Sequence, residues 1–166
     1  MYYELNDSFE VPADADRCWD FFGRAENLPL ITPPWLHFTL AMPTPLPPIR
    51  QDAVLDYTIR WFGVRVKWRT RIIDWAPPRQ FIDLQTRGPY ELWHHQHTFE
   101  PSESGGVICR DRVIYKLPVP GVRRVVHALA VRRQLLEIFR YRRKVIAKHL
   151  GWMRALQDDV TITRVD

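Results

Sequence analysis

The chain has 166 residues, the usual length of one domain, and the seven Trp, six Tyr and eight Phe give it a large stock of broad apolar side chains. The net charge is +5, but residues 122–150 alone hold nine Lys or Arg and one acid, so that segment is +8 and the remainder is −3. The basicity therefore belongs to one element. We interpret it as a solvated helix face, with an acidic membrane surface as the alternative partner, and we do not expect nucleic-acid binding.

The sequence contains no obvious membrane span, and its first residues lack the basic and apolar regions of a signal peptide, so we expect a cytoplasmic protein. Cys18 and Cys109 are far apart in the sequence and have no metal-ligand spacing. We interpret both as small core residues. Neither a disulfide, a zinc site nor a cofactor is predicted.

The first third of the chain predicts one strand followed by short helices. Residues 2–11 alternate as a strand does, and Asp14 is placed to cap a short helix that ends near Gly23. A further helical turn is predicted at 26–31. The proline-rich segment 43–48 predicts a rigid, extended connection.

From residue 35 the apolar period changes to two, which predicts a series of strands separated by Gly and Pro turns. On the hairpin at Gly63, large apolar residues occupy one face and Arg or Lys the other, so the apolar face needs a cover. Short connections favour an antiparallel sheet. The predicted strands cover residues 35–42, 53–62, 64–75, 80–86, 91–100 and 107–117.

The cover for the sheet is the basic C-terminal segment, which predicts a long helix over 122–150. At 100° per residue, one apolar arc contains Val125, Ala128, Leu129, Leu135, Leu136, Phe139, Ile146, Ala147 and Leu150. Arg132 and Arg143 fall within the same arc and are predicted to point toward the cavity or its mouths. Each could instead extend along the helix edge or pair with an acid such as Asp83 or Asp111. We predict one domain over 1–152 and a tail over 153–166.

Two phrases of the sequence, GPYELWHHQHTFEP at 88–101 and GGVICRDRVIYKLP at 105–118, resemble the START-like SRPBCC superfamily, which includes polyketide cyclase/dehydrase-like proteins. The order of the predicted elements resembles it too. The resemblance implies an α+β helix-grip fold. In that fold a curved antiparallel sheet of about seven strands wraps around a long C-terminal helix, two short helices follow the first strand, and a ligand cavity lies between sheet and helix. It does not imply a particular ligand.

Strand alternation separates the three histidines of the segment WHHQH. Trp93 and Phe99 are the largest apolar residues of their strand, and His95 and His97 share their parity. We therefore predict that His95 and His97 face the interior and that His94 faces outward.

The neighbouring strands add polar groups to the same concave face. Parity places Asp111, Tyr115 and Asp83 inward, and the resemblance implies that Gln85 also faces inside. Such groups either satisfy one another, as His97 and Asp111 can, or orient a ligand. Two histidines at i and i+2 with a carboxylate could also form a metal site, but strand spacing is a weak signal and no metal is predicted.

These observations predict a protein that binds or transports a hydrophobic small molecule, such as a lipid, isoprenoid, polyketide or aromatic compound. One of the inward arginines is expected to receive a ligand oxygen. The predicted ligand-binding residues are Trp61, Trp68, Gln85, Trp93, His95, His97, Asp111, Tyr115, Arg132, Phe139 and Arg143.

Two alternatives remain open. The first is a cyclase/dehydratase-like enzyme, for which the sequence offers no nucleophile motif and only weak candidates, with His95 or His97 as base and Asp111 orienting it. The second is an interaction module that docks on acidic membrane or a protein through the basic helix.

Overall fold

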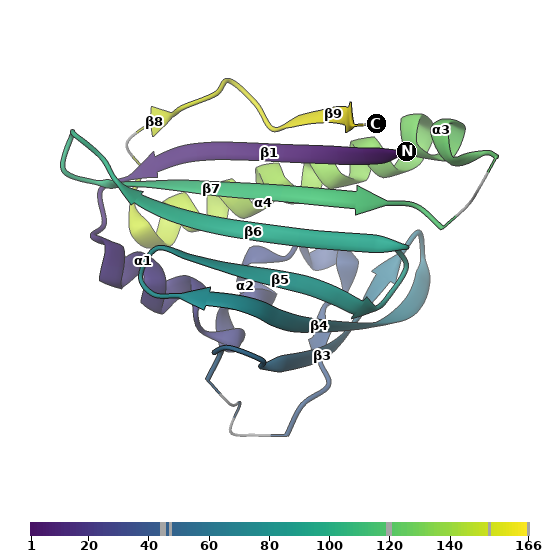
Figure 1. Cartoon of the computed structure of the whole chain (residues 1–166), viewed down its shortest axis with the longest axis horizontal. Coiled ribbons are helices and arrows are strands. Elements are labelled where there is room, and N and C mark those ends of the chain that lie inside the picture. The colour runs from purple at the N-terminus through teal and green to yellow at the C-terminus, as the bar shows by residue number, and fades with distance from the viewer. Residues whose placement is uncertain (44–45, 47, 119–120, 153, 166) are drawn as a thin grey trace.

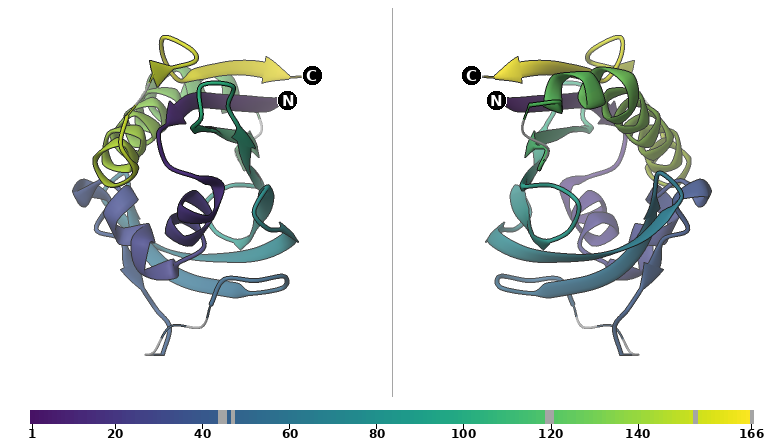
Figure 2. Two further views of the ribbon diagram at one scale, coloured as in Figure 1. Left: turned by 90° about the vertical axis from the view of Figure 1, so that its left-hand side faces the viewer. Right: turned by 90° about the vertical axis from the view of Figure 1, so that its right-hand side faces the viewer.

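The computed structural model describes residues 1–166 except 44, 45, 47, 119, 120, 153 and 166. The described residues form one curved antiparallel sheet with a long helix across its concave side (Figures 1 and 2). The strand order is β2-β3-β4-β5-β6-β7-β1-β8, and β9 also pairs with β1. The strands are β1 (Tyr2–Val11), β2 (Thr39–Leu40), β3 (Val54–Trp61), β4 (Val64–Ala76), β5 (Gln80–Arg87), β6 (Leu92–Pro101), β7 (Val107–Lys116), β8 (Arg154–Ala155) and β9 (Thr161–Val165).

The helical elements confirm the predicted helix-grip order. They are α1 (Ala15–Phe22), the 3₁₀ turns η1 (Ala25–Asn27) and η2 (Pro34–Leu36), α2 (Leu28–Ile31), α3 (Arg123–Val126), the π-helical segment η3 (His127–Val131) and α4 (Arg132–Leu150). The carboxylate of Asp14 accepts a hydrogen bond from the backbone N–H of Arg17 at 2.7 Å, so α1 begins at the predicted cap. No helix in the described part of the chain is long and apolar enough to cross a membrane.

The strand predicted at 35–42 is largely absent. Residues 34–36 form a 3₁₀ turn, His37 has a left-handed backbone with φ of 46°, and only Thr39–Leu40 pairs with β3. A left-handed residue interrupts the extended backbone that a strand requires. The extended connection predicted at 43–48 lies partly outside the described residues, since 44, 45 and 47 are not among them.

The segment predicted as a tail contains two strands. β9 pairs antiparallel with β1 over five residue pairs, and β8 pairs with the far end of β1. In Figure 1 this yellow segment runs along β1 and brings the two termini close together. The last residues therefore extend the sheet beyond its predicted edge.

The helix that covers the sheet differs from a uniform helix at its start. The segment His127–Val131 is π-helical, with more residues per turn than an α-helix. A helical wheel drawn at 100° per residue therefore gives the wrong directions for the side chains in and before this segment. Beyond it, Leu135, Phe139 and Ile146 are buried as predicted. Leu129, which the wheel placed inward, is 78% exposed.

Two successive arginines of α4 join this helix to two neighbouring strands. Asp7 of β1 and Asp111 of β7 are directly paired in register, and both are buried on the concave face. Arg143 forms an ion pair with Asp7, and Arg142 forms one with Asp111. Burial raises the pKa of the Asp7 carboxyl, and the ion pair with Arg143 only partly opposes this.

Replacing Arg143 with Met is expected to lower the free energy of unfolding by about 1.5–3 kcal/mol at pH 7, because a buried carboxylate loses its charged partner. The loss should be smaller at pH 5. Since the folded-state pKa of Asp7 lies above its unfolded value, protonation as the pH falls removes the cost of the buried charge. Urea unfolding at both pH values measures this. Arg133→Met, which removes an exposed pair with Glu137, is the control; an equal loss in both variants would contradict the prediction.

Candidate functional site

A cavity of about 180 Å³ lies between the concave face of the sheet and the helices α2 and α4. Aromatic side chains supply much of its wall, and leucine and isoleucine side chains supply a further part. Cavities with walls of this kind hold small apolar molecules. The aromatic lining residues are Phe22, Phe38, Tyr57, Trp61, Trp68, Phe81, Tyr90, Trp93 and Phe139.

Alternation on β3, β4 and β6 presents the rings of Tyr57, Trp61, Trp68 and Trp93 to the cavity. Trp68 packs edge-to-face against Trp93 at 5.5 Å between centroids. The indole N–H of Trp68 donates to the Thr70 hydroxyl at 3.0 Å. The indole Nε1 of Trp61 is buried and has no hydrogen-bond partner among the described residues.

A charged cluster forms one part of the cavity wall, and Asp111 lies at its centre. The Arg142 guanidinium donates from Nε to Asp111 Oδ2 at 3.1 Å and from Nη2 to Oδ1 at 3.3 Å. Both side chains are at most 9% exposed. The Arg142 guanidinium also lies over the ring of Phe22 and lines the cavity. The ion pair with Asp111 neutralises its charge, and the Phe22 ring adds a cation–π contact.

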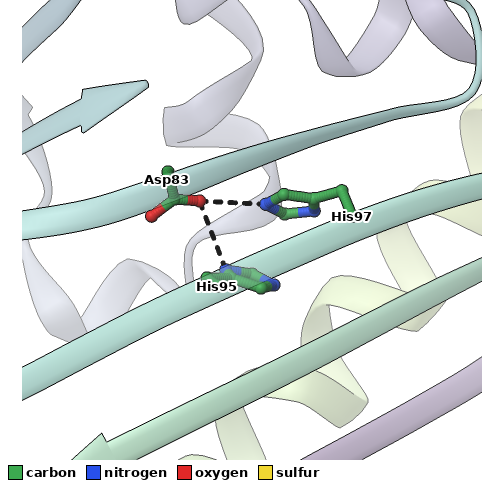
Figure 3. Close-up of side chains that lie close together, drawn as sticks. All are labelled: Asp83, His95 and His97. Carbon is green, nitrogen blue, oxygen red and sulfur yellow. Dashed lines mark hydrogen bonds and ion pairs between the residues drawn. The ribbon is translucent and has the colours of Figure 1, made fainter. Parts of the chain in front are cut away.

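Two histidines on β6 lie between two carboxylates. His95 Nε2 is 2.9 Å and His97 Nδ1 is 2.8 Å from the same oxygen of Asp111. Their other ring nitrogens face Asp83 Oδ2 on β5, at 3.5 Å from His95 Nδ1 and 3.0 Å from His97 Nε2 (Figure 3). Asp83, His95 and His97 line the cavity, whereas Asp111 is set behind them. These three are also the described residues whose donor atoms could hold a metal ion.

The environment shifts the pKa values of the two histidines in opposite directions. Burial, together with the neighbouring His97, lowers the pKa of His95 to about 4, so its ring is neutral at pH 7. Burial also acts to lower the pKa of His97, but contacts with Asp111 and Asp83 outweigh it and raise that pKa. Burial opposes ionisation of Asp111, yet Arg142 and the histidines hold its pKa well below the usual value.

The structure confirms the predicted burial of the two inward histidines. His95 and His97 are 7% and 4% exposed, while His94 is partly exposed on the opposite face of β6. Of the residues predicted to contact a ligand, the cavity is lined by Trp61, Trp68, Trp93, His95, His97 and Phe139.

The other five predicted residues do not line the cavity, and one of them, Asp111, is set behind the two histidines. Gln85 bonds to the backbone N–H and carbonyl of Tyr90, so it holds the β5–β6 turn. Tyr115 is buried and forms a hydrogen bond with His127 at 2.7 Å. Arg132 is exposed at the start of α4. Arg143 faces the sheet but binds Asp7, which strand parity also places inward.

The sequence reasoning missed Arg142 and undervalued Asp83. Arg142 lies three residues after Phe139, a spacing that puts both on one helix face, but it falls just beside the predicted apolar arc. Strand parity predicts that Asp83 faces inward, but it gives this carboxylate no role beyond pairing with an arginine. The signal that could have found it is its place opposite His95 on the neighbouring strand.

The sequence matches one known protein family over most of its length. Residues 11–140 match the family described as polyketide cyclase / dehydrase and lipid transport. The chain belongs to this family. No curated protein sequence matches the chain significantly.

Solved structures support the helix-grip fold of this family member. TTHA0849 from Thermus thermophilus has a TM-score of 0.63 and 16% identity, with 89% of this chain and 96% of that chain covered. Major latex-like protein 151 from Panax ginseng has a TM-score of 0.65 and 11% identity, with 90% and 98% covered. The di-domain aromatase/cyclase StfQ of the steffimycin biosynthetic pathway has a TM-score of 0.65 and 12% identity, with 90% of this chain and 51% of that chain covered. At these identities the likeness establishes the fold alone.

Proposed function

We propose that this family member binds or carries a largely apolar small molecule, such as a lipid, isoprenoid, polyketide or aromatic compound, in the cavity between sheet and α4. The observation that carries the proposal is an aromatic-walled cavity with a small number of polar groups at its wall. The cluster around His95 gives such a ligand a place to bind an oxygen. Two buried free thiols, Cys18 and Cys109, favour a reducing compartment such as the cytoplasm.

Replacing Ile138 with Trp is expected to weaken binding of anilinonaphthalene sulfonate about tenfold or more, a change of about 1.4 kcal/mol, because Ile138 lines the cavity and the larger ring fills it. Energy transfer from the cavity tryptophans to the probe measures the affinity. Ile73→Trp is the matched control, since Ile73 is exposed on β4. The same affinity in both variants would show that the probe binds elsewhere.

The natural ligand can be identified directly. Protein purified from its native host is denatured, and the organic extract is compared by mass spectrometry with an extract of the Ile138→Trp variant. A compound present in stoichiometric amount with the unmutated protein and depleted from the variant would be the ligand. No such compound in either extract would count against a tightly bound cargo.

An acid–base enzyme of the cyclase/dehydratase type is the second candidate. The observation in its favour is the neutral His95 ring at the cavity wall, with Asp111 2.9 Å from its Nε2. A carboxylate at one nitrogen orients the ring and leaves the other nitrogen to accept a proton. A carrier would keep its ligand unchanged, whereas such an enzyme would convert it.

Membrane docking is a third candidate, favoured by exposed apolar side chains beside the basic helix. Val122, Val125 and Leu129 are 56%, 58% and 78% exposed and lie at the start of the helical segment. Arg132 and Arg133 follow on the same segment and are exposed. Exposed aliphatic groups next to arginines suit an anionic lipid surface from which a carrier could take up its ligand.

A further inference from the structure

Asp83, His95 and His97 place three metal-ligand atoms close together at the cavity wall. Asp83 on β5 is in register with His95 on β6, and His97 lies two residues further along the same face. Figure 3 shows one oxygen of Asp83 facing a nitrogen of each ring. The three donor atoms all lie within 4.8 Å of one another.

The four ring nitrogens cannot all be satisfied by the two carboxylates without excess positive charge. Each histidine has one nitrogen facing Asp111 and the other facing Asp83. A neutral imidazole carries one N–H, so a ring that donates to Asp111 turns a lone pair toward the Asp83 oxygen. Protonating both rings would put two imidazolium cations 3.8 Å apart beside Arg142. At least one lone pair therefore faces a carboxylate oxygen, and a bound cation would remove that repulsion.

The distances from Asp83 to the two histidines suit such a cation. Nitrogen and oxygen ligands lie about 2.0–2.2 Å from zinc, so ligand atoms of one site are roughly 3 to 4 Å apart. The Asp83 oxygen is 3.5 Å from His95 Nδ1 and 3.0 Å from His97 Nε2. The far nitrogen of each ring lies within 2.9 Å of Asp111 Oδ1, and a carboxylate in that position usually orients a metal-ligating histidine.

We propose that Asp83, His95 and His97 bind a divalent transition-metal ion of the zinc, cobalt or iron(II) class, with Asp111 orienting both histidines. All three ligands line the cavity, so the remaining coordination positions face it and are open to water or to an oxygen of a bound molecule. Arg142 is the neighbouring cation, and its ion pair with Asp111 offsets its charge. The proposal does not depend on which organic ligand the cavity holds.

The test uses the full chain, freed of metal by a chelator, and titrates it with Co²⁺ alone and Zn²⁺ alone. We expect one equivalent of Co²⁺ to bind and give visible absorption bands, with Zn²⁺ in competition. Asp83→Asn and His95→Gln should each weaken binding about 100-fold or more, and Asp111→Asn about 10- to 100-fold. His94→Gln, on the same strand but the opposite face, should bind as the unmutated protein does.

A second measurement needs no variant at the site. In the unmutated protein, Zn²⁺ should shift the imidazole NMR resonances of His95 and His97 and leave those of His94 unchanged. The proposal is overturned if no saturable Co²⁺ or Zn²⁺ binding occurs, if binding survives in folded Asp83→Asn protein, or if the histidines that respond lie elsewhere. Because the probe is the metal alone, failure here leaves the binding of apolar molecules untouched.

Discussion

Replacing Arg142 with Met is expected to lower the free energy of unfolding by about 3–5 kcal/mol, the usual cost of breaking a buried ion pair. The reason is Asp111, whose side chain is 5% exposed and whose two oxygens both accept from the guanidinium. Methionine fills the space of the apolar stem but leaves the carboxylate without its counter-charge. Chemical unfolding monitored by circular dichroism measures the loss.

Arg140 on the same helix supplies a matched control. Its ion pair with Asp159 is about half exposed, so Arg140→Met should cost at most about 1 kcal/mol. Asp111→Asn combined with Arg142→Met removes both charges, and this double variant should be more stable than Arg142→Met alone by about 1 kcal/mol or more. A double variant as unstable as the sum of the single changes would show that the two residues do not interact.

Replacing Phe139 with Ala should lower the free energy of unfolding by about 3 kcal/mol, the lower end of the range for a buried Phe. Phe139 is 3% exposed, packs edge-to-face on His95 and borders the cavity on one side. Because that side is already open, the change removes contacts on the remaining sides only. In a chain of this length the melting temperature should fall by roughly 6–12 °C.

Leu129→Ala is the control for this prediction. A uniform helical wheel places Leu129 and Phe139 in the same inward arc, but Leu129 is 78% exposed. Its replacement should change the free energy of unfolding by no more than about 0.5 kcal/mol. A large loss at Leu129 would support the uniform wheel. An unchanged melting temperature for Phe139→Ala would contradict the buried position of Phe139.

Local pattern was sufficient for much of the fold. A period of two assigned β3 to β7, and parity with Trp93 and Phe99 placed His95 and His97 on the concave face. A capping residue fixed the start of α1. These features depend on neighbours within a few residues, which the sequence displays directly.

The rest of the candidate site depended on contacts between distant segments. Arg142 is more than thirty residues from Asp111 in the sequence, and Arg143 is more than a hundred from Asp7, so no local spacing could assign either pair. In the π-helical segment His127–Val131, backbone hydrogen bonds join residues five apart instead of four, which rotates the residues before it relative to those after it. The spacing of apolar residues does not predict this change. The pairing of β9 with β1 likewise joins segments at opposite ends of the sequence, so local pattern does not predict it.

By itself, therefore, the sequence determined the order of β1, α1, the strands β3 to β7 and the long helix, the face of each central strand and the presence of inward histidines, because strand alternation and caps are local. Only the tertiary structure decided which arginine reaches the cavity, which carboxylates surround the histidines, and that Gln85 and Tyr115 serve the scaffold. A buried charged side chain pairs with the opposite charge that the packed sheet and helix bring near it. The distance between the two charges is set only when the chain folds.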